Sequence, residues 1–83
     1  MSNKEKIIIE LVEQILYTDI NCDVYANLIN VGMDSIKVIQ LLVKLEEEFN
    51  IEFADEDLQM KFFVSIKEIA KLVDKKLNER EFK

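Results

Sequence analysis

Apolar residues recur at helical spacing in three long stretches of this chain. The first stretch starts near Ser2 or Asn3 and runs to about Tyr17, with polar residues between its isoleucines, leucines and valines. The second covers residues 35–49, and the third follows Ser65. Apolar positions three and four residues apart lie on one face of an α-helix, so each stretch predicts a helix that buries one face.

Shorter segments connect these helices. Residues 18–33 are mostly polar and predict a long loop, held in place by apolar side chains that reach the core. Four residues are expected to do this: Val24, Tyr25, Leu28 and Ile29. Residues 55–60 begin with three acids, which favour a helix N-terminus, and predict a short helix. Ser65 and Glu68 form a capping box before the last helix, and the charged tail 78–83 is expected to fray.

The composition favours an all-α fold. The chain has 83 residues, of which 49% are hydrophobic, with no proline and one glycine, so the usual turn residues of β-rich folds are missing. We expect one domain over residues 1–83, a four-helix bundle with three long helices and a short third helix. No apolar run reaches a membrane-spanning length and no signal pattern opens the chain, so a cytoplasmic protein is expected. The single cysteine, Cys22, agrees with a reducing compartment.

Charge is distributed unevenly along the chain, whose formal net charge is −6. Residues 1–60 carry 13 acids and 4 bases, a net −9, whereas residues 61–83 carry 4 acids and 7 bases, a net +3. Seven acids and no base lie between Glu46 and Asp57. Such a surface repels phosphate backbones, so we expect no nucleic-acid partner and an attraction for basic proteins. Charge alone leaves open that this segment is only a solvated helix end and loop.

The second helix has apolar residues on two opposite faces. At about 100° per residue, one set spans roughly 140° to 240° around the helix when Ile36 is placed at 0°. This set is the expected core face: Val38, Leu41, Leu42, Leu45 and Phe49. Ile36, Ile39 and Val43 lie on nearly the opposite side. A bundle this small can hardly bury both faces, so the second stripe is either covered by the long loop or left exposed as a docking surface. Spacing alone does not decide between them.

Ser35 lies at the N-terminal end of this helix. Unpaired backbone N–H groups and the positive end of the helix dipole favour an anion there, such as a phosphodiester. Gly32, just upstream, can adopt a positive φ and allows a close approach to the backbone. The alternative is that Asp34 and Ser35 only cap the helix.

Several kinds of catalytic or metal site are excluded by the residues present. The chain has no histidine, so Ser35 lacks the base of a hydrolytic triad, and a single cysteine cannot supply a zinc site. One glycine cannot build a Gly-rich phosphate loop. A calcium loop starting at Asp19 fails at Val24 and Asn30, where glycine and glutamate are needed. Cys22 has no basic neighbour in sequence and is expected to be inert. We expect no enzymatic activity.

The start of the second helix carries a recognisable motif. An Asp-Ser pair opens the helix, a glycine precedes it and an apolar residue follows it, in Gly32-Met33-Asp34-Ser35-Ile36. Together with the helix order, the long first loop and the acidic end of the second helix, this motif resembles the attachment region of the acyl and peptidyl carrier protein family. The fold that the resemblance implies is the four-helix carrier bundle.

The resemblance also implies a cofactor and roles for individual residues. Ser35 would accept a covalent 4′-phosphopantetheine arm from coenzyme A, through a separate Mg²⁺-dependent phosphopantetheinyl transferase. The thiol of the arm would then hold an acyl or aminoacyl group as a thioester. The transferase would recognise Asp34, Gly32 and Met33. Partner enzymes would contact five residues: Ile36, Ile39, Gln40, Val43 and Glu47.

The branch of the family is indicated by the residues after the serine. The run Ile36-Lys37-x-Ile39-Gln40 is more similar to peptidyl carriers, because fatty-acid carriers usually have leucine and then an acid there. We therefore predict a freestanding, monomeric carrier for nonribosomal peptide or siderophore-type biosynthesis, loaded by an adenylating enzyme and used by condensing or transferring enzymes, without a membrane partner. A carrier of fatty acid or polyketide synthesis is the first alternative. The second, from another class, is a small acidic helical adaptor with no covalent arm.

Overall fold

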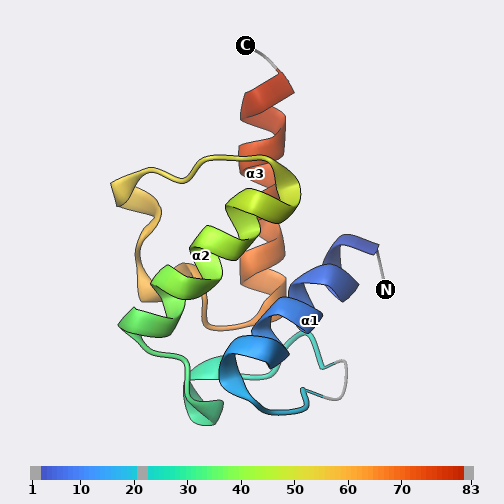
Figure 1. Ribbon diagram of the computed structural model, residues 1–83, viewed down its shortest axis with the longest axis vertical. Coiled ribbons are helices and arrows are strands. Elements are labelled where there is room, and N and C mark those ends of the chain that lie inside the picture. Colours follow the sequence, from blue (N-terminus) through green and yellow to red (C-terminus); the bar gives the residue numbers. More distant parts are fainter. Residues whose placement is uncertain (1–2, 21–22, 82–83) are drawn as a thin grey trace.

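The computed structural model describes residues 3–20 and 23–81. Within these residues every regular element is helical, which confirms the all-α prediction (Figure 1). The three α-helices are α1 (Asn3–Leu16), α2 (Ser35–Phe49) and α3 (Ile66–Glu81). Three short 3-10 helices lie in the connections: η1 (Leu28–Val31), η2 (Asp55–Asp57) and η3 (Met60–Phe62). In the part of the chain described, no helix has the length and apolar character needed to cross a membrane.

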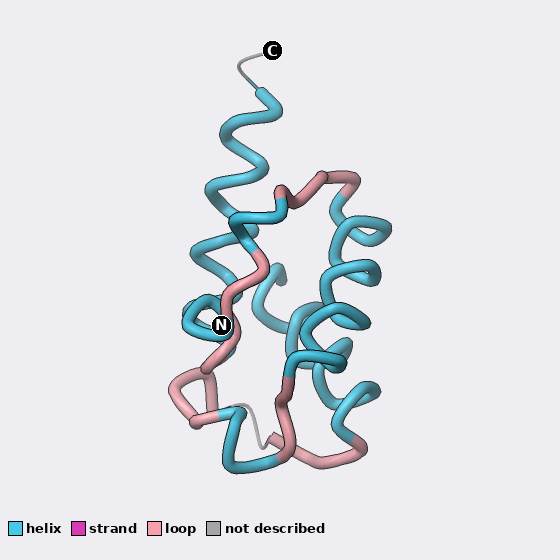
Figure 2. The backbone as a smooth tube through the Cα atoms, turned by 90° about the vertical axis from the view of Figure 1, so that its left-hand side faces the viewer, coloured by secondary structure: helices cyan, strands magenta, loops and turns pink. Residues whose placement is uncertain are grey.

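The three α-helices pack against one another around one core. α1 contacts both α2 and α3, and the C-terminal part of α3 extends beyond the other helices (Figure 1, Figure 2). An ion pair of 3.1 Å between Lys67 and Glu5 joins α3 to α1, and a second joins Lys4 to Asp74. The fully buried large side chains come from all three helices and two connections: Ile8, Val12, Leu28, Leu41, Leu45, Phe63, Ile66, Ile69 and Val73. The predicted core faces are therefore confirmed.

Backbone hydrogen bonds hold the loop between α1 and α2 against residues 64 and 67. The N–H of Leu28 donates to the carbonyl of Val64 at 2.8 Å, and the carbonyl of Val24 accepts the N–H of Lys67 at 3.0 Å. Leu28 is buried and Val24 is half-buried, as expected. The expectation was wrong for Tyr25 and Ile29, which are 74% and 46% exposed. These two bonds hold the backbone at Val24 and Leu28, whose side chains face the core. The side chains of the next residues, Tyr25 and Ile29, therefore face outward. Cys22 lies outside the described residues.

The predicted short helix over residues 55–60 is instead interrupted. η2 closes with a 3-10 bond, in which the N–H of Leu58 donates to the carbonyl of Asp55 at 3.1 Å. The helix ends there, since the next N–H, that of Gln59, donates to the carbonyl of Asp57, only two residues back, at 2.9 Å. The Asp57 side chain is buried and paired with Lys76 of α3 at 2.6 Å. This tertiary contact ties the turn to α3, so it does not continue as an α-helix, and η3 forms separately.

The last helix starts where the capping box predicted. The N–H of Glu68 donates to the hydroxyl oxygen of Ser65 at 3.2 Å, and the Glu68 carboxylate pairs with Lys71 at 3.2 Å. α3 continues through Glu81, the last described residue, and the expected fraying of the tail from residue 78 stays a prediction. No glycine or proline interrupts this stretch. An ion pair of 3.7 Å between Lys76 and Glu79, one turn apart, also supports the helix.

Candidate functional site

Asp34, and not Ser35, caps α2. Asp34 has extended backbone angles, and its Oδ1 accepts the N–H of Lys37 at 2.9 Å. The neighbouring Ser35 is exposed, and its hydroxyl makes no hydrogen bond with any other residue that the structure describes. Capping therefore does not occupy Ser35, and its oxygen is available to react.

The Asp34 carboxylate is held in its ionised form. The N–H of Lys37 donates to it, and the Lys37 ammonium lies 3.5 Å from Oδ2. Together these groups, the backbone N–H first, outweigh desolvation, which alone would raise the pKa, and lower the pKa of Asp34 below its usual 3.8. The residue before Ser35 in sequence is thus negatively charged at neutral pH and paired with Lys37.

Gly32 and Met33, the two residues before Asp34, differ in what the structure requires of them: a backbone angle at Gly32 and a buried side chain at Met33. Gly32 has φ of 111°, in the left-handed region, and its N–H donates to the carbonyl of Ile29 at 3.2 Å. A Cβ there would meet only Leu16, at 4.0 Å, so the backbone angle rather than space requires glycine. Met33 is 3% exposed. Its side chain is therefore buried in the core and not exposed for a direct contact, and its part in transferase recognition stays a prediction.

The second apolar stripe of α2 is exposed. Ile36, Ile39 and Val43 are 69%, 54% and 46% exposed, so the long loop does not cover them. On the other side of the helix, four residues of the predicted core face are buried and Phe49 is half-buried. The helix therefore has two apolar faces with different surroundings, as its spacing indicated.

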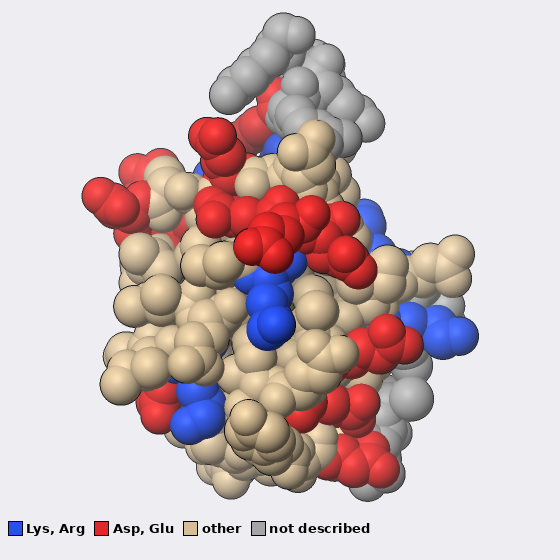
Figure 3. Space-filling model, viewed as in Figure 1, with Lys and Arg blue, Asp and Glu red and all other residues tan. Residues whose placement is uncertain are grey.

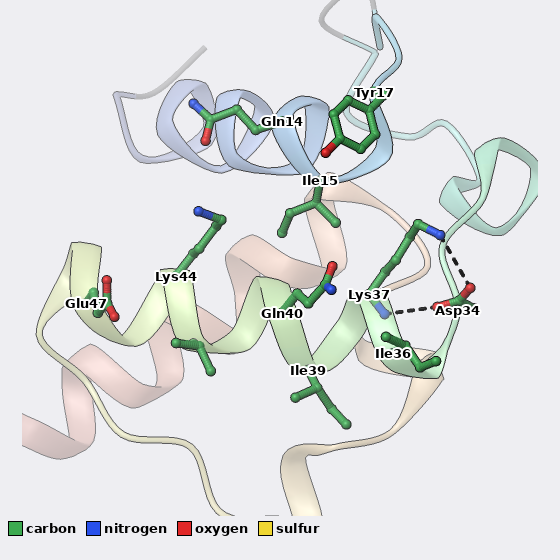
Figure 4. A pocket seen from close by; sticks show the side chains of 11 residues that line it. Gln14, Ile15, Tyr17, Asp34, Ile36, Lys37, Ile39, Gln40, Lys44 and Glu47 are labelled. Atoms are coloured by element: carbon green, nitrogen blue, oxygen red, sulfur yellow. Dashed lines mark hydrogen bonds and ion pairs between the residues drawn. The ribbon is translucent and has the colours of Figure 1, made fainter.

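A groove of about 810 Å³ separates α2 from the end of α1 (Figure 4). It brings together Asp34 and all five predicted partner residues, including Gln40 and Glu47. Sequence reasoning missed its other lining residues: Gln14, Ile15, Tyr17, Lys37 and Lys44. The exposure of Tyr17 could not be predicted, because nothing in the local pattern shows that α1 ends beside α2.

Ser35 itself lies at a smaller cavity on the other side of the stripe. This cavity has a volume of about 110 Å³ and lies between α2 and the η2–η3 segment. Its lining consists of Ser35, Val38, Ile39, Leu58 and Met60. Ile39 borders both hollows, so the attachment candidate and the groove share one residue.

The acids at the end of α2 form a concentrated negative surface. Figure 3 shows them gathered over the upper part of this helix, with one basic side chain directly beneath them and mostly uncharged surface around it. Glu46 has a structural role, because its carboxylate accepts the N–H of Phe53 at 2.9 Å, while Glu47 and Glu48 are exposed. Among the described residues no group of acids or cysteines is arranged to hold a metal ion.

Comparisons with known proteins agree with this geometry. Residues 6–73 match the family described as the phosphopantetheine attachment site. A stretch of 60 residues, 71% of this chain, is 38% identical to an acyl carrier protein of Syntrophus aciditrophicus (strain SB) and covers 75% of that protein. The chain belongs to the phosphopantetheine-binding carrier protein family. No solved structure matches it significantly.

Carrier proteins of this family are non-catalytic and act with partner enzymes, among them a phosphopantetheinyl transferase. Their cofactor is a covalent 4′-phosphopantetheine, which supplies the thiol that forms the thioester with the cargo. The residues of this chain fit such a group. The exposed Ser35 oxygen can take a phosphodiester at the N-terminus of α2, where the helix dipole favours negative charge.

Proposed function

We propose that this carrier protein receives its 4′-phosphopantetheine arm on Ser35. The observation that carries the proposal is that Asp34, and not Ser35, caps α2. Ser35 keeps an exposed hydroxyl with no partner among the described residues. The Ser35 oxygen would attack the phosphorus next to the pantetheine, breaking the phosphoanhydride bond of coenzyme A; adenosine 3′,5′-bisphosphate would leave, the serine proton would pass to a base of the transferase, and a phosphodiester would remain on Ser35. Asp34, ionised beside it, would help a transferase to place its Mg²⁺ and Ser35 together.

We further propose that the cargo belongs to nonribosomal peptide or siderophore-type biosynthesis. The residues that follow Ser35 support this, since Ile36 is aliphatic and Lys37 is basic. The cavity beside Ser35 also supports it: its volume of about 110 Å³ is below that of an apolar cavity of roughly 150 Å³ that holds one benzene. A long alkyl chain would not fit there, whereas an aminoacyl or short acyl group on the arm needs no such enclosure. Adenylating enzymes would load the arm, and condensing or transferring enzymes would use it.

A carrier of fatty acid or polyketide synthesis is the second candidate. The similar protein of Syntrophus is an acyl carrier protein, and the acids Glu47 and Glu48 on α2 suit the basic partners that such a surface attracts. Incubating the carrier that bears the arm with amino-acid and aryl-acid adenylating enzymes, and separately with a malonyl transferase, separates the two. Thioester formation with the malonyl transferase alone would favour the second candidate.

We also propose that the protein acts as a monomer in the cytoplasm, where coenzyme A and its transferase are present. The net charge of −6 supports the monomer, because two copies repel each other. Sedimentation at low and high protein concentration tests this directly.

Intact mass spectrometry tests the attachment itself. After incubation with coenzyme A, Mg²⁺ and a broad-specificity transferase, the protein is expected to gain one phosphopantetheine, and fragment spectra should place it on Ser35. Ser35→Ala should stay unmodified while its circular dichroism is unchanged, because Asp34 still caps α2. A protein that gains no arm, or an alanine variant that gains it equally, would leave the adaptor without a covalent arm as the better description.

A further inference from the structure

Tyr17 is held outward at the end of α1. Its side chain is 91% exposed, and its φ of 55° lies in the left-handed region that residues other than glycine seldom adopt. The N–H of Tyr17 donates to the carbonyl of Glu13 at 2.9 Å, and the Glu13 carboxylate accepts the N–H of Ile20 at 2.8 Å. This braced turn presents a large aromatic ring beside the groove instead of packing it into the core.

The α2 side of the groove has a polar part and an aliphatic edge. Lys37, Gln40 and Lys44 point toward α1, where Tyr17 and Ile15 line the groove, while Ile36 and Ile39 of the exposed stripe lie at its outer edge and point away from α1 (Figure 4). Tyrosine is among the residues that most often dominate binding energy, and a continuous exposed apolar surface marks an interaction site. The docking surface therefore extends from α2 across the groove to α1.

The charges in the groove are only partly matched within the protein. Lys37 is paired with Asp34 at 3.5 Å. Lys44 makes no ion pair with any residue in the described part of the chain. Its side chain extends from α2 toward α1, into the groove (Figure 4). Lys44 is exposed and has no counterion within the described residues, so a carboxylate from a partner can pair with it.

We propose that the groove between α1 and α2 receives a segment of a partner enzyme, which places an apolar side chain against Tyr17 and a carboxylate beside Lys44. The inference rests on the proposed carrier function, which requires such partners. Basic groups of the partner would then meet Glu47 and Glu48, so charge fixes the direction in which the partner lies along α2. A second copy of this chain is a poor occupant, because its net charge of −6 opposes close approach.

Two model peptides test the groove. Both are amphipathic helices of about 15 residues with the same leucine and phenylalanine face, one with glutamates and the other with lysines on its flanks. Each is titrated into the isotope-labelled protein and followed by amide chemical shifts. The acidic peptide is expected to shift signals of Tyr17, Ile39 and Lys44, whereas the basic peptide shifts those of Glu48, an exposed acid outside the groove. Binding of the acidic peptide would be unusual, because a protein with a net charge of −6 attracts basic partners overall.

Matched variants assign the effect to single side chains. Lys44→Glu should weaken the acidic peptide by about fivefold, the size of a partly exposed ion pair. Lys6→Glu changes the net charge equally at an exposed site of α1 that does not line the groove, and it should leave the affinity unchanged. Tyr17→Asn keeps a residue that tolerates a positive φ but removes the ring, and it should weaken binding by about tenfold.

Three results would overturn the proposal. The first is that groove signals stay still with the acidic peptide at millimolar concentration, and the second is that the basic peptide binds the groove more tightly. The third is that groove signals move with the concentration of the protein itself, which would identify a second copy as the occupant. The mass gained from coenzyme A is measured on the same samples. A protein that takes the arm but fails the peptide test keeps the proposed function and loses this inference. One that passes the peptide test but never takes the arm loses the proposed function, and with it the partner class named here.

Discussion

Lys76 on α3 and Asp57 in η2 form an ion pair of 2.6 Å whose side chains are only 10% and 4% exposed. Asp57 Oδ2 also accepts the N–H of Ala54 at 2.7 Å. The pair anchors the segment between α2 and α3, which includes one wall of the cavity beside Ser35. Asp57 is the one buried polar or charged residue in the described part of the chain, so this contact is the main electrostatic tie of the fold.

Removing one partner of this pair should destabilise the protein strongly. Asp57→Asn or Lys76→Met leaves the other charge buried without its counterion, and we expect a loss of about 3 kcal/mol in the free energy of unfolding. Urea denaturation followed by circular dichroism measures it. Lys71→Met breaks the exposed pair with Glu68 and should cost less than about 1 kcal/mol. Equal losses in the two kinds of variant would contradict the assigned role.

The same pair predicts how stability depends on pH. Burial alone would raise the pKa of Asp57, but the hydrogen bonds from Lys76 and Ala54 outweigh it and lower the pKa below 3.8. Burial alone would lower the pKa of Lys76, but its bond to Asp57 raises the pKa above 10.5. The stabilisation is thus complete between about pH 4 and 10.

Below that window stability should fall as Asp57 takes up a proton in the folded state, and above it as Lys76 loses one. Thermal melts from pH 2 to 11 of the wild type and of Asp57→Asn check this. The variant should lose less stability than the wild type as the pH falls below about 4. A parallel decline of both proteins would show that other carboxylates determine the acid limit.

Asp34 should combine a structural role with a recognition role, and two substitutions separate them. Asp34→Ala removes the cap of α2 and should lower the melting temperature by a few degrees. Asp34→Asn still caps but lacks the charge, so it should melt like the wild type. Its rate of phosphopantetheine transfer should nevertheless fall by roughly tenfold, the effect of one lost interaction with an ion. If the asparagine variant is modified at the full rate, the charge has no part in recognition.

A charge introduced on α2 should affect stability little on the exposed face and strongly on the core face. Ile39→Asp alters an exposed position, so the free energy of unfolding should change by less than about 0.5 kcal/mol, while transfer to Ser35 slows. Leu42→Asp buries a charge without a partner and should cost at least about 4 kcal/mol, enough to unfold a domain of this size. Helicity and transfer rate are measured on both. Similar helicity losses in the two variants would contradict the exposed stripe.

Gly32 should resist substitution because of its backbone angle. At φ of 111° an alanine is strained although no atom blocks its Cβ, so we expect Gly32→Ala to cost about 1–2 kcal/mol. Gly32→Asn should cost less, since asparagine tolerates positive φ better. Chemical denaturation of both variants gives the comparison, and an alanine variant as stable as the wild type would show that the turn can relax.

The features that sequence predicted correctly are those encoded within one element. The bounds of α2, from Ser35 to Phe49, follow from a cap and a regular apolar spacing. The start of α3 follows from the pairing of Ser65 with the backbone of Glu68. Each depends on residues at most one or two turns apart, whose relative positions the helix itself sets.

The errors occurred where a contact between distant segments decides the outcome. Tyr25 and Ile29 face outward because backbone bonds to the segment around α3 orient the loop. Residues 55–60 break into η2 and η3 because Asp57 is drawn to Lys76. In both places the local pattern was compatible with more than one arrangement, and packing selected one.

The sequence by itself determined the family, the position of Ser35 and the presence of two apolar faces on α2, because helical geometry converts spacing along one segment into direction in space. Only the tertiary structure decided that Asp34 rather than Ser35 provides the cap, that the second face stays uncovered, and that Tyr17 and Lys44 share a groove. Those outcomes depend on how α1 and the loop lie against α2, and the packing of separate segments is set by the whole core rather than by any local pattern.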